Sequence, residues 1–286
     1  KKDADEYKKF LNNLKDFDLK KEIKDLNKED AIYVMIIGES SSKLHSSIYG
    51  YYRNTTPELL RLKNNNELVV FNNIITPHSQ TREALQEVLT LKSSEVNKKF
   101  YEVPSILDFF NATEFKTYWL SNQESYGIIG NAVASIASKA QYTKYTEEYS
   151  SDSRKFKKYD EALLPMLDKV LEEKIPKKFI VIHLMGNHMQ YQERYPEKFK
   201  HFKDIDKNFN DWQLKKNICY RIQGVFYIIN YLKGGNIMKK FLSCVLATAM
   251  LVGVLAGCGN SSSNAPADDK EEQTQSDEGS TDPIYF

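Results

Sequence analysis

Residues 31–42 read Ala-Ile-Tyr-Val-Met-Ile-Ile-Gly-Glu-Ser-Ser-Ser, and this stretch decides the fold. An unbroken apolar run stops abruptly at Gly38-Glu39, a pattern typical of a buried strand that ends in a carboxylate. In open α/β sheets, ligands bind beyond the carboxyl ends of the strands, so Glu39 stands where it can hold a metal ion. The alternative is a solvated glutamate at the end of a strand, with no chemical role.

Further apolar runs alternate along the chain between strand-like and helix-like patterns. Short apolar runs predict three more strands, at 68–71, 116–120 and 179–184. Apolar residues at helical spacing predict helices at 81–91 and 159–173. Shorter helices are expected at 57–64, which opens with Pro57, at 106–110, and at 131–140, a run of small residues. This alternation is typical of an α/β fold with a layered, mainly parallel sheet. Residues 1–30, rich in lysine and acids around apolar positions, predict a helical connector.

The composition narrows the class of protein. The chain has 286 residues and a net charge of +1, and no basic stripe is interleaved with aromatic residues, which argues against a nucleic-acid partner. Its three cysteines, Cys219, Cys244 and Cys258, all lie in the last quarter of the sequence. The region that carries Glu39 therefore has neither a disulfide framework nor a thiolate metal site.

The last fifth of the chain departs from the α/β pattern. Met238-Lys239-Lys240 precedes an apolar stretch that ends in Leu255-Ala256-Gly257-Cys258. This order predicts a bacterial lipoprotein signal peptide at 238–258, with a lipobox and lipidation at Cys258. Residues 259–286, rich in Ser, Asn, Asp, Glu and Gln, predict a disordered polar tether. The alternative is a membrane helix, for which about 16 apolar or small residues are a marginal length.

Residues 217–237 form a separate segment, which lacks an acidic face. We interpret them as out-of-frame or intergenic sequence, because Lys233-Gly234-Gly235 can be encoded by a purine-rich ribosome-binding site just before Met238. The hypothesis is that two neighbouring reading frames have been joined. A genuine buried strand or helix at 217–230 is the alternative.

Four blocks in order carry a family resemblance. Gly-Glu-Ser-Ser-Ser at 38–42, followed by Ile-Tyr-Gly-Tyr-Tyr-Arg-Asn-Thr-Thr-Pro at 48–57, resembles the opening motif of the phosphoethanolamine transferases. These are membrane-bound members of the alkaline phosphatase and sulfatase superfamily. The resemblance continues at 71–81, 118–123 and 183–196 and covers roughly residues 28–215. It implies a layered sheet of alkaline phosphatase/sulfatase type, incomplete at its C-terminal end, with a partial catalytic domain at 31–216.

The resemblance implies a nucleophile and a metal ligand. Thr81 begins a predicted helix, where free N–H groups and the positive end of the helix dipole favour an anion. By resemblance Thr81 is the catalytic nucleophile, and Glu39 and Thr81 are zinc ligands. The alternative is that Thr81 is an ordinary N-cap, a role that is compatible with catalysis.

Three further residues are implied as substrate-binding residues. His188 stands in Gly-Asn-His after a predicted strand and by resemblance contacts the transferred phosphate or a second zinc ion. Asn122 and Gln123 follow another strand, in the loop that the family uses to grip phosphoethanolamine. The alternatives are a solvated loop histidine and an ordinary polar loop. His183, inside its strand, is interpreted as a hydrogen-bonded core histidine.

One family motif is missing from the sequence. The family completes its zinc site with an Asp-His pair, and none of the five histidines follows an aspartate here: His45, His78, His183, His188 and His201. Half of the expected zinc ligands are therefore absent, and we expect weak zinc binding and no measurable activity from this polypeptide.

The resemblance also implies a reaction and a location. Phosphoethanolamine would pass from phosphatidylethanolamine, through a phospho-threonine, to lipid A or another envelope lipid or glycan. The catalytic domain would lie on the periplasmic side of the bacterial inner membrane. The rivals are a sulfatase or phosphoglycerol transferase, and a non-catalytic broken domain fused to a lipoprotein leader. No Cys/Ser-x-Pro-x-Arg motif of sulfatases occurs near Thr81.

Overall fold

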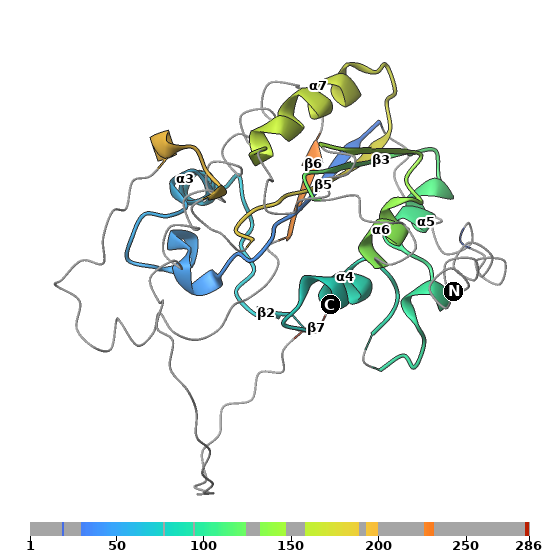
Figure 1. Cartoon of the computed structure of the whole chain (residues 1–286), viewed down its shortest axis with the longest axis horizontal. Coiled ribbons are helices and arrows are strands. Elements are labelled where there is room, and N and C mark those ends of the chain that lie inside the picture. Colours follow the sequence, from blue (N-terminus) through green and yellow to red (C-terminus); the bar gives the residue numbers. More distant parts are fainter. Residues whose placement is uncertain are drawn as a thin grey trace, which may run out of the picture.

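A five-stranded sheet forms the centre of the fold, in the order β4-β3-β5-β1-β6 (Figure 1). The computed structural model describes residues 19, 30–188 without 77, 94, 124–131 and 147–157, 193–199, 226–231 and 284–285. The strands are β1 (Ile32–Ile37), β3 (Lys116–Ser121), β4 (Tyr142–Tyr145), β5 (Lys178–His183) and β6 (Phe226–Tyr231). All pairs are parallel except β1 with β6, which is antiparallel. The predicted mainly parallel α/β sheet is confirmed.

The register of the sheet brings three strand ends to one level. Ile37 of β1 and Ser121 of β3 both pair with His183 of β5. The residues that follow these strands, among them Glu39 and Asn122, therefore meet at one edge of the sheet, which we call the carboxyl edge. This is the edge at which α/β sheets bind ligands.

Helices cover both faces of the sheet (Figure 1). The α-helices are α3 (Pro57–Asn64), α4 (Thr81–Val88), α5 (Ile106–Asn111), α6 (Ala132–Ala137) and α7 (Leu164–Glu172). Short 3-10 turns are η2 (Lys43–His45), η3 (Ser47–Tyr49), η4 (Phe100–Glu102), η6 (Asp160–Leu163) and η8 (Glu197–Phe199). A separate two-residue strand, β2 (Ile74–Ile75), pairs with β7 (Ile284–Tyr285).

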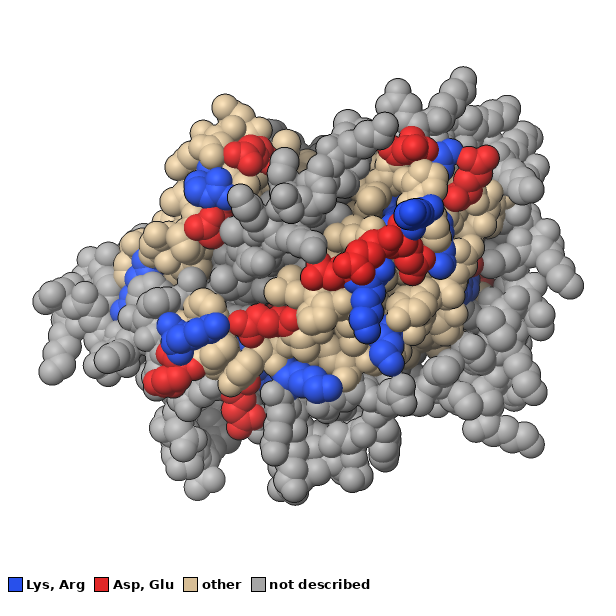
Figure 2. Space-filling model, turned by 90° about the horizontal axis from the view of Figure 1, so that it is seen from above, with Lys and Arg blue, Asp and Glu red and all other residues tan. Residues whose placement is uncertain are grey.

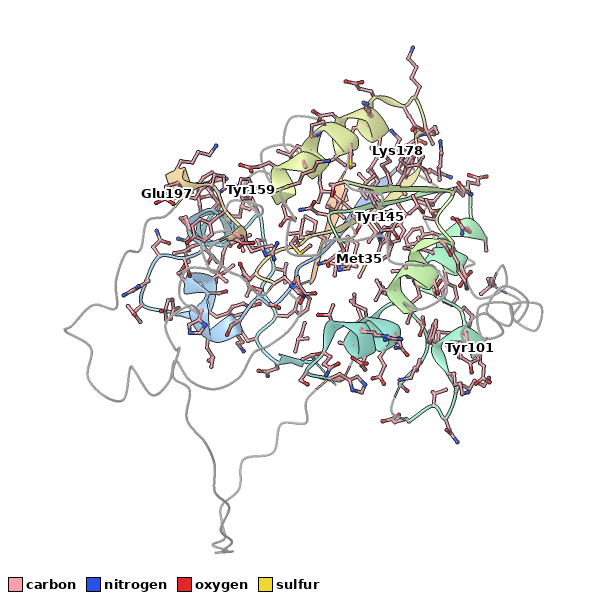
Figure 3. All side chains as sticks on the ribbon, in the orientation of Figure 1. Met35, Tyr101, Tyr145, Tyr159, Lys178 and Glu197 are labelled. Atoms are coloured by element: carbon pink, nitrogen blue, oxygen red, sulfur yellow. The ribbon has the colours of Figure 1, made fainter. Side chains whose placement is uncertain are left out.

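Two apolar cores lie on opposite faces of the sheet. On one face, Val34 and Ile36 pack with residues of α3 and α7, including Leu167. On the other face, Met35 and Ile37 pack with residues of α4, α5 and α6. Successive strand residues point to opposite faces, so a strand covered on both sides needs an unbroken apolar run. Side chains fill the space between the sheet and both helical layers (Figure 3).

Some boundaries differ from the sequence predictions. The strand predicted at 68–71 is wrong: the segment is irregular, and its side chains alternate between the core and solvent, with Val69 77% exposed. The helix predicted at 159–173 starts as the turn η6, and α7 begins beside Pro165, which suits a first helical turn because it has no N–H to donate.

The remaining predicted segments fall largely outside the described residues. This applies to the connector at 1–30, of which only Leu19 and Asp30 are described, and to the signal peptide at 238–258. Within 217–237 the structure has the strand β6, and the interpretation of this segment as out-of-frame or intergenic sequence stays a prediction. Among the described residues no helix is long and apolar enough to span a bilayer.

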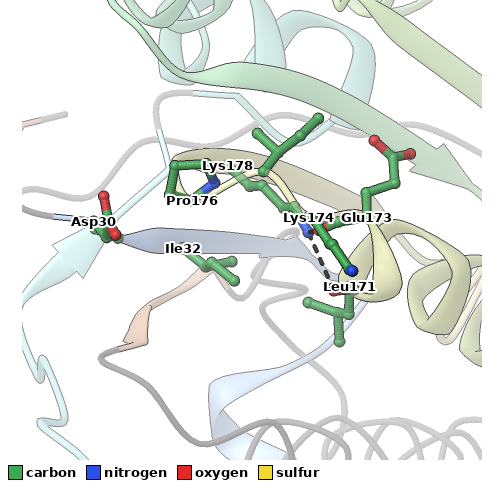
Figure 4. Close-up of a pocket in the computed structure, with 9 residues that line it drawn as sticks. Asp30, Ile32, Leu171, Glu173, Lys174, Pro176 and Lys178 are labelled. Atoms are coloured by element: carbon green, nitrogen blue, oxygen red, sulfur yellow. Dashed lines mark hydrogen bonds between the residues drawn. The ribbon is translucent and has the colours of Figure 1, made fainter.

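The opposite edge of the sheet holds a buried lysine. Lys178 opens β5, is 1% exposed, and its Nζ donates to the carbonyl oxygens of Val170, Leu171 and Glu173, at 2.6, 3.2 and 2.6 Å. These carbonyls end α7, where a cation is favourable. Burial lowers the pKa of Lys178. A shallow cavity of about 310 Å³ lies beside it (Figure 4).

One face of the molecule carries mixed charge in its described part. Lys and Arg side chains lie among Asp and Glu side chains on the face seen in Figure 2, without a large patch of one sign. This agrees with the net charge of +1 for the whole chain.

Candidate functional site

Glu39 and Thr81 meet at the carboxyl edge. Glu39, two residues beyond β1, is 5% exposed, and its Oε1 accepts hydrogen bonds from Thr81 Oγ1 at 2.8 Å and Ser40 Oγ at 2.9 Å. Thr81 is the first residue of α4, and Gln80 is its N-cap, so the interpretation of Thr81 as an ordinary N-cap is wrong. The buried carboxylate therefore orients the Thr81 hydroxyl at a helix N-terminus, where the helix dipole favours negative charge.

The loop after β5 packs directly on Glu39. We call residues 184–188 the β5 loop. Gly186 has φ +52°, and a Cβ atom there would lie 2.8 Å from the carbonyl oxygen and 2.9 Å from the nitrogen of Glu39. The Asn187 amide donates to the same Glu39 oxygen at 2.9 Å. Only glycine fits this position, because both the left-handed backbone and the close approach exclude a side chain.

The side-chain amides of Asn122 and Gln123 are hydrogen-bonded to other groups of the protein. Asn122 is fully buried; its Nδ2 donates to Asp160 Oδ1 at 2.7 Å and to the Lys158 carbonyl at 3.2 Å, and its Oδ1 accepts from Thr146. The Nε2 of Gln123 donates to the carbonyl of Leu184 at 2.7 Å. In this structure both residues support the loops around the site, and Asn122 has no exposed surface for a substrate.

Asp160 lies beside these loops, although its local sequence did not indicate a role at the site. It lies in η6, is 3% exposed, and accepts from the amides of Met185 at 2.8 Å and Gly186 at 2.9 Å. Burial raises the pKa of this carboxyl, while its hydrogen bonds and the charge of Arg194 oppose the rise. An acid just before a helical pattern normally indicates a helix start.

The two histidines of the third motif differ in environment. His188 is half-buried; its amide donates to the Met185 carbonyl at 3.2 Å, and its own carbonyl accepts from Arg194 Nε at 3.4 Å. His183 is buried edge-on against Trp119, with ring centroids 5.9 Å apart, and burial lowers its pKa to about 4. The predicted core location of His183 is confirmed, but its Nε2 has no hydrogen-bond partner.

Buried polar atoms without partners concentrate at this edge. Among the described residues they are Glu83 Oε2, His183 Nε2, and Asn187 Nδ2 and Oδ1. Glu83 stands two positions after Thr81 on α4, and Asn187 is bonded through its backbone to Glu39. Unpartnered buried groups are costly and are characteristic of functional sites.

The described residues do not fit a complete zinc site. Glu39 and Thr81 supply two converging oxygen ligands, but in the described part of the chain no three His, Cys, Asp or Glu side chains cluster to hold a metal ion. A tetrahedral zinc site needs three or four protein ligands.

Comparison with known proteins gives the family. Residues 31–255 match the family model described as Sulfatase. The chain belongs to the sulfatase family. The match extends past residue 216 and includes β6.

Individual relatives of this sulfatase-family chain are phosphoethanolamine transferases. Phosphoethanolamine transferase EptC of Escherichia coli K12 is 34% identical over 170 residues, which is 59% of this chain and 29% of that protein. CptA of Salmonella typhimurium is 34% identical over 57% of this chain and 28% of its own length. The chain thus spans less than a third of these relatives. The predicted resemblance to phosphoethanolamine transferases is confirmed.

A solved structure supports the fold. The C-terminal periplasmic domain of E. coli EptC, in complex with zinc, superposes with a TM-score of 0.58 and 26% identity, over 80% of this chain and 59% of that domain. The predicted sulfatase-type fold is therefore confirmed.

Proposed function

We propose that this chain carries the nucleophile part of a phosphoethanolamine transferase site. The observation that carries the proposal is the 2.8 Å hydrogen bond from Thr81 Oγ1 to buried Glu39 at the N-terminus of α4. The names of the relatives, phosphoethanolamine transferases EptC and CptA, support the transferred group.

In the proposed reaction, Thr81 Oγ attacks the phosphorus of phosphatidylethanolamine. An Oγ–P bond forms, the P–O bond to glycerol breaks, and diacylglycerol leaves with a proton. Glu39 orients the hydroxyl and accepts its hydrogen bond, and N–H groups at the start of α4 face the developing negative charge. A hydroxyl of an envelope lipid or glycan, such as lipid A, then attacks the phospho-threonine and releases Thr81.

The proposed roles of the other predicted residues follow from their contacts. His188 lies on the β5 loop beside Glu39 and is the candidate for contact with the phosphate. Asn122 and Gln123 act indirectly, because their amides hold the loops. Zinc would use Glu39 and Thr81 as two of its ligands, and no step is assigned to it because the described residues do not complete the site.

Activity of residues 1–286 alone is proposed to be absent. Two oxygen ligands do not retain zinc, and an unassisted threonine hydroxyl is a weak nucleophile. The same observation favours a second candidate function, a non-catalytic product that joins a transferase fragment to a lipoprotein leader. In both cases the domain belongs to the periplasmic side of the inner membrane.

A hybrid enzyme separates the two candidates. Residues 31–199 of this chain would replace the matched segment of E. coli EptC, which supplies the rest of the site. We expect the hybrid to form a covalent phosphoethanolamine adduct, visible by intact-mass measurement. Thr81→Ala should abolish the adduct and Thr81→Ser should retain part of it. An adduct on the Ala variant would refute the nucleophile, and a folded hybrid without any adduct would favour the non-catalytic product.

Lipidation at Cys258 is a separate proposal from the sequence of residues 238–258. Expressed from Met238, the segment should be exported and acylated at Cys258, and Cys258→Ala should leave it unprocessed. Processing that is unchanged in the Ala variant would contradict the lipobox.

A further inference from the structure

The β5 loop is held by contacts from several parts of the chain. The carbonyl of Leu184 accepts from Gln123, and the carbonyl of His188 accepts from Arg194. The Asn187 amide donates to Glu39. Met185 and Gly186 lie between Leu184 and Asn187. Both donate their backbone N–H groups to the carboxylate of Asp160.

The Asp160 carboxylate binds two successive backbone amides with separate oxygens. Oδ1 accepts from the Met185 amide at 2.8 Å and Oδ2 accepts from the Gly186 amide at 2.9 Å. Oδ1 also accepts from Asn122 Nδ2 at 2.7 Å. Three donors on a carboxylate that is 3% exposed compensate for the burial of its charge.

We propose that Asp160 is a positioning residue of the site, whose carboxylate holds the β5 loop so that Gly186 rests on the backbone of Glu39 and the part of the loop that carries His188 is fixed. The consequence for catalysis rests on the proposed function. The contact between Gly186 and Glu39 leaves no room for adjustment, since a Cβ atom on Gly186 would lie within 3 Å of the Glu39 backbone. A loop released from Asp160 therefore loses its place against the backbone of Glu39, and His188 moves with the loop.

An isosteric variant, Asp160→Asn, tests the hydrogen bonds between Asp160 and the β5 loop selectively. Asp160→Asn keeps the shape of the side chain but turns one oxygen into an NH₂ group. In either orientation that group faces a backbone N–H, of Met185 or of Gly186, so at least one hydrogen bond is lost. Glu161→Gln makes the same chemical change at the next residue, whose nearest cation, Lys198, is 3.9 Å away at the surface, and it serves as the matched control.

Hydrogen exchange of the full-length wild-type chain gives the first test. The amides of Met185 and Gly186 lie beyond β5, yet we expect them to exchange as slowly as the amides within the strand. Fast exchange of both amides in the wild-type chain would overturn the proposal without any variant. In Asp160→Asn, exchange of the peptide that spans 184–188 should accelerate about tenfold or more, as expected from one lost hydrogen bond to a charged group. Glu161→Gln should leave it unchanged.

The second test asks whether the loop matters to the site. O-phosphoethanolamine is added while the ring resonances of His188 are followed by NMR, with His188→Gln for assignment. We expect a response in the wild-type chain and in Glu161→Gln, and at least a tenfold weaker apparent affinity in Asp160→Asn. An unchanged response in Asp160→Asn, despite faster loop exchange, would overturn the positioning role. Slow loop exchange that depends on Asp160, with no head-group response in any variant, would support the loop contact and count against the proposed function.

Discussion

Both ends of the strands of the central sheet bury polar side chains, but among the described residues the carboxyl edge also leaves some buried polar atoms without a partner. At the edge where β5 begins, the ammonium of Lys178 donates to three carbonyl oxygens at the end of α7. At the carboxyl edge, His183 and Asn187 bury polar atoms without a partner. A buried polar group without a hydrogen bond costs about 1–3 kcal/mol. The first edge therefore stabilises the fold, and the second gives up stability where Glu39 and Thr81 lie.

The largest expected effect on stability concerns Lys178, at the end of the sheet where β5 begins. Lys178→Met keeps the length of the side chain but removes the donor to all three carbonyls. We expect the free energy of unfolding to fall by about 3–4 kcal/mol, the sum of lost hydrogen bonds to a charged donor. Urea unfolding measures it. Lys174→Met, on an exposed residue lining the same cavity, is the control and should change stability by less than about 0.5 kcal/mol. Equal changes in the free energy of unfolding for Lys178→Met and Lys174→Met would show that the three hydrogen bonds of Lys178 do not stabilise the fold.

The second effect is the pH dependence of stability that arises from His183 at the carboxyl edge. Burial lowers the pKa of His183 to about 4 in the folded chain, below its ordinary value of 6.5. Its neutral form therefore stabilises the fold fully above pH 6.5, and this contribution is lost as the pH falls from 6.5 to about 4. The loss amounts to up to about 3 kcal/mol.

Unfolding of His183→Phe as a function of pH tests this assignment. The variant keeps a ring against Trp119 and should lack this part of the pH dependence between pH 6.5 and 4. If His183→Phe follows the wild-type profile, the ring is not buried in its neutral form.

The smallest effect has the opposite sign. Asn187 is 1% exposed, and both polar atoms of its amide lack partners. Asn187→Leu replaces them with apolar atoms of similar volume and should raise the free energy of unfolding by about 1–2 kcal/mol. Asn122→Leu is the matched contrast, because that buried amide is fully bonded and its removal should destabilise by about 2–4 kcal/mol. Destabilisation by Asn187→Leu would show that a bound water or ligand satisfies the amide.

Short-range patterns in the sequence predicted much of the fold and placed Glu39 at a strand end, whereas Thr81 was indicated by the family resemblance. β1 and β5 are apolar on both faces, and Glu39 and Thr81 stand where an element ends or begins. A short apolar run also predicted a strand at 68–71, which is irregular, because the same pattern arises when a segment lies on the core without a strand to pair with.

The supporting contacts of the site could not be predicted from local patterns. Asn122 is bonded to Asp160, 38 positions away, and Gln123 to Leu184, 61 positions away. A polar residue after a strand has the same local sequence whether it faces a ligand or another loop. The pairing of β6 with β1 is likewise a long-range event, and nothing local to residues 226–231 specifies the partner.

Because β1 lies between β5 and β6 in the sheet, it is synthesised well before either of the strands that pair with it. β1 is made first, but Lys178 of β5, which pairs with Ile32, follows about 145 residues later. At roughly 5–20 residues per second, on the order of ten seconds pass before β1 has a neighbour. Throughout that interval an apolar strand has both edges unpaired and Glu39 at its end, so the newly made chain exposes an aggregation-prone segment until β5 has left the ribosome.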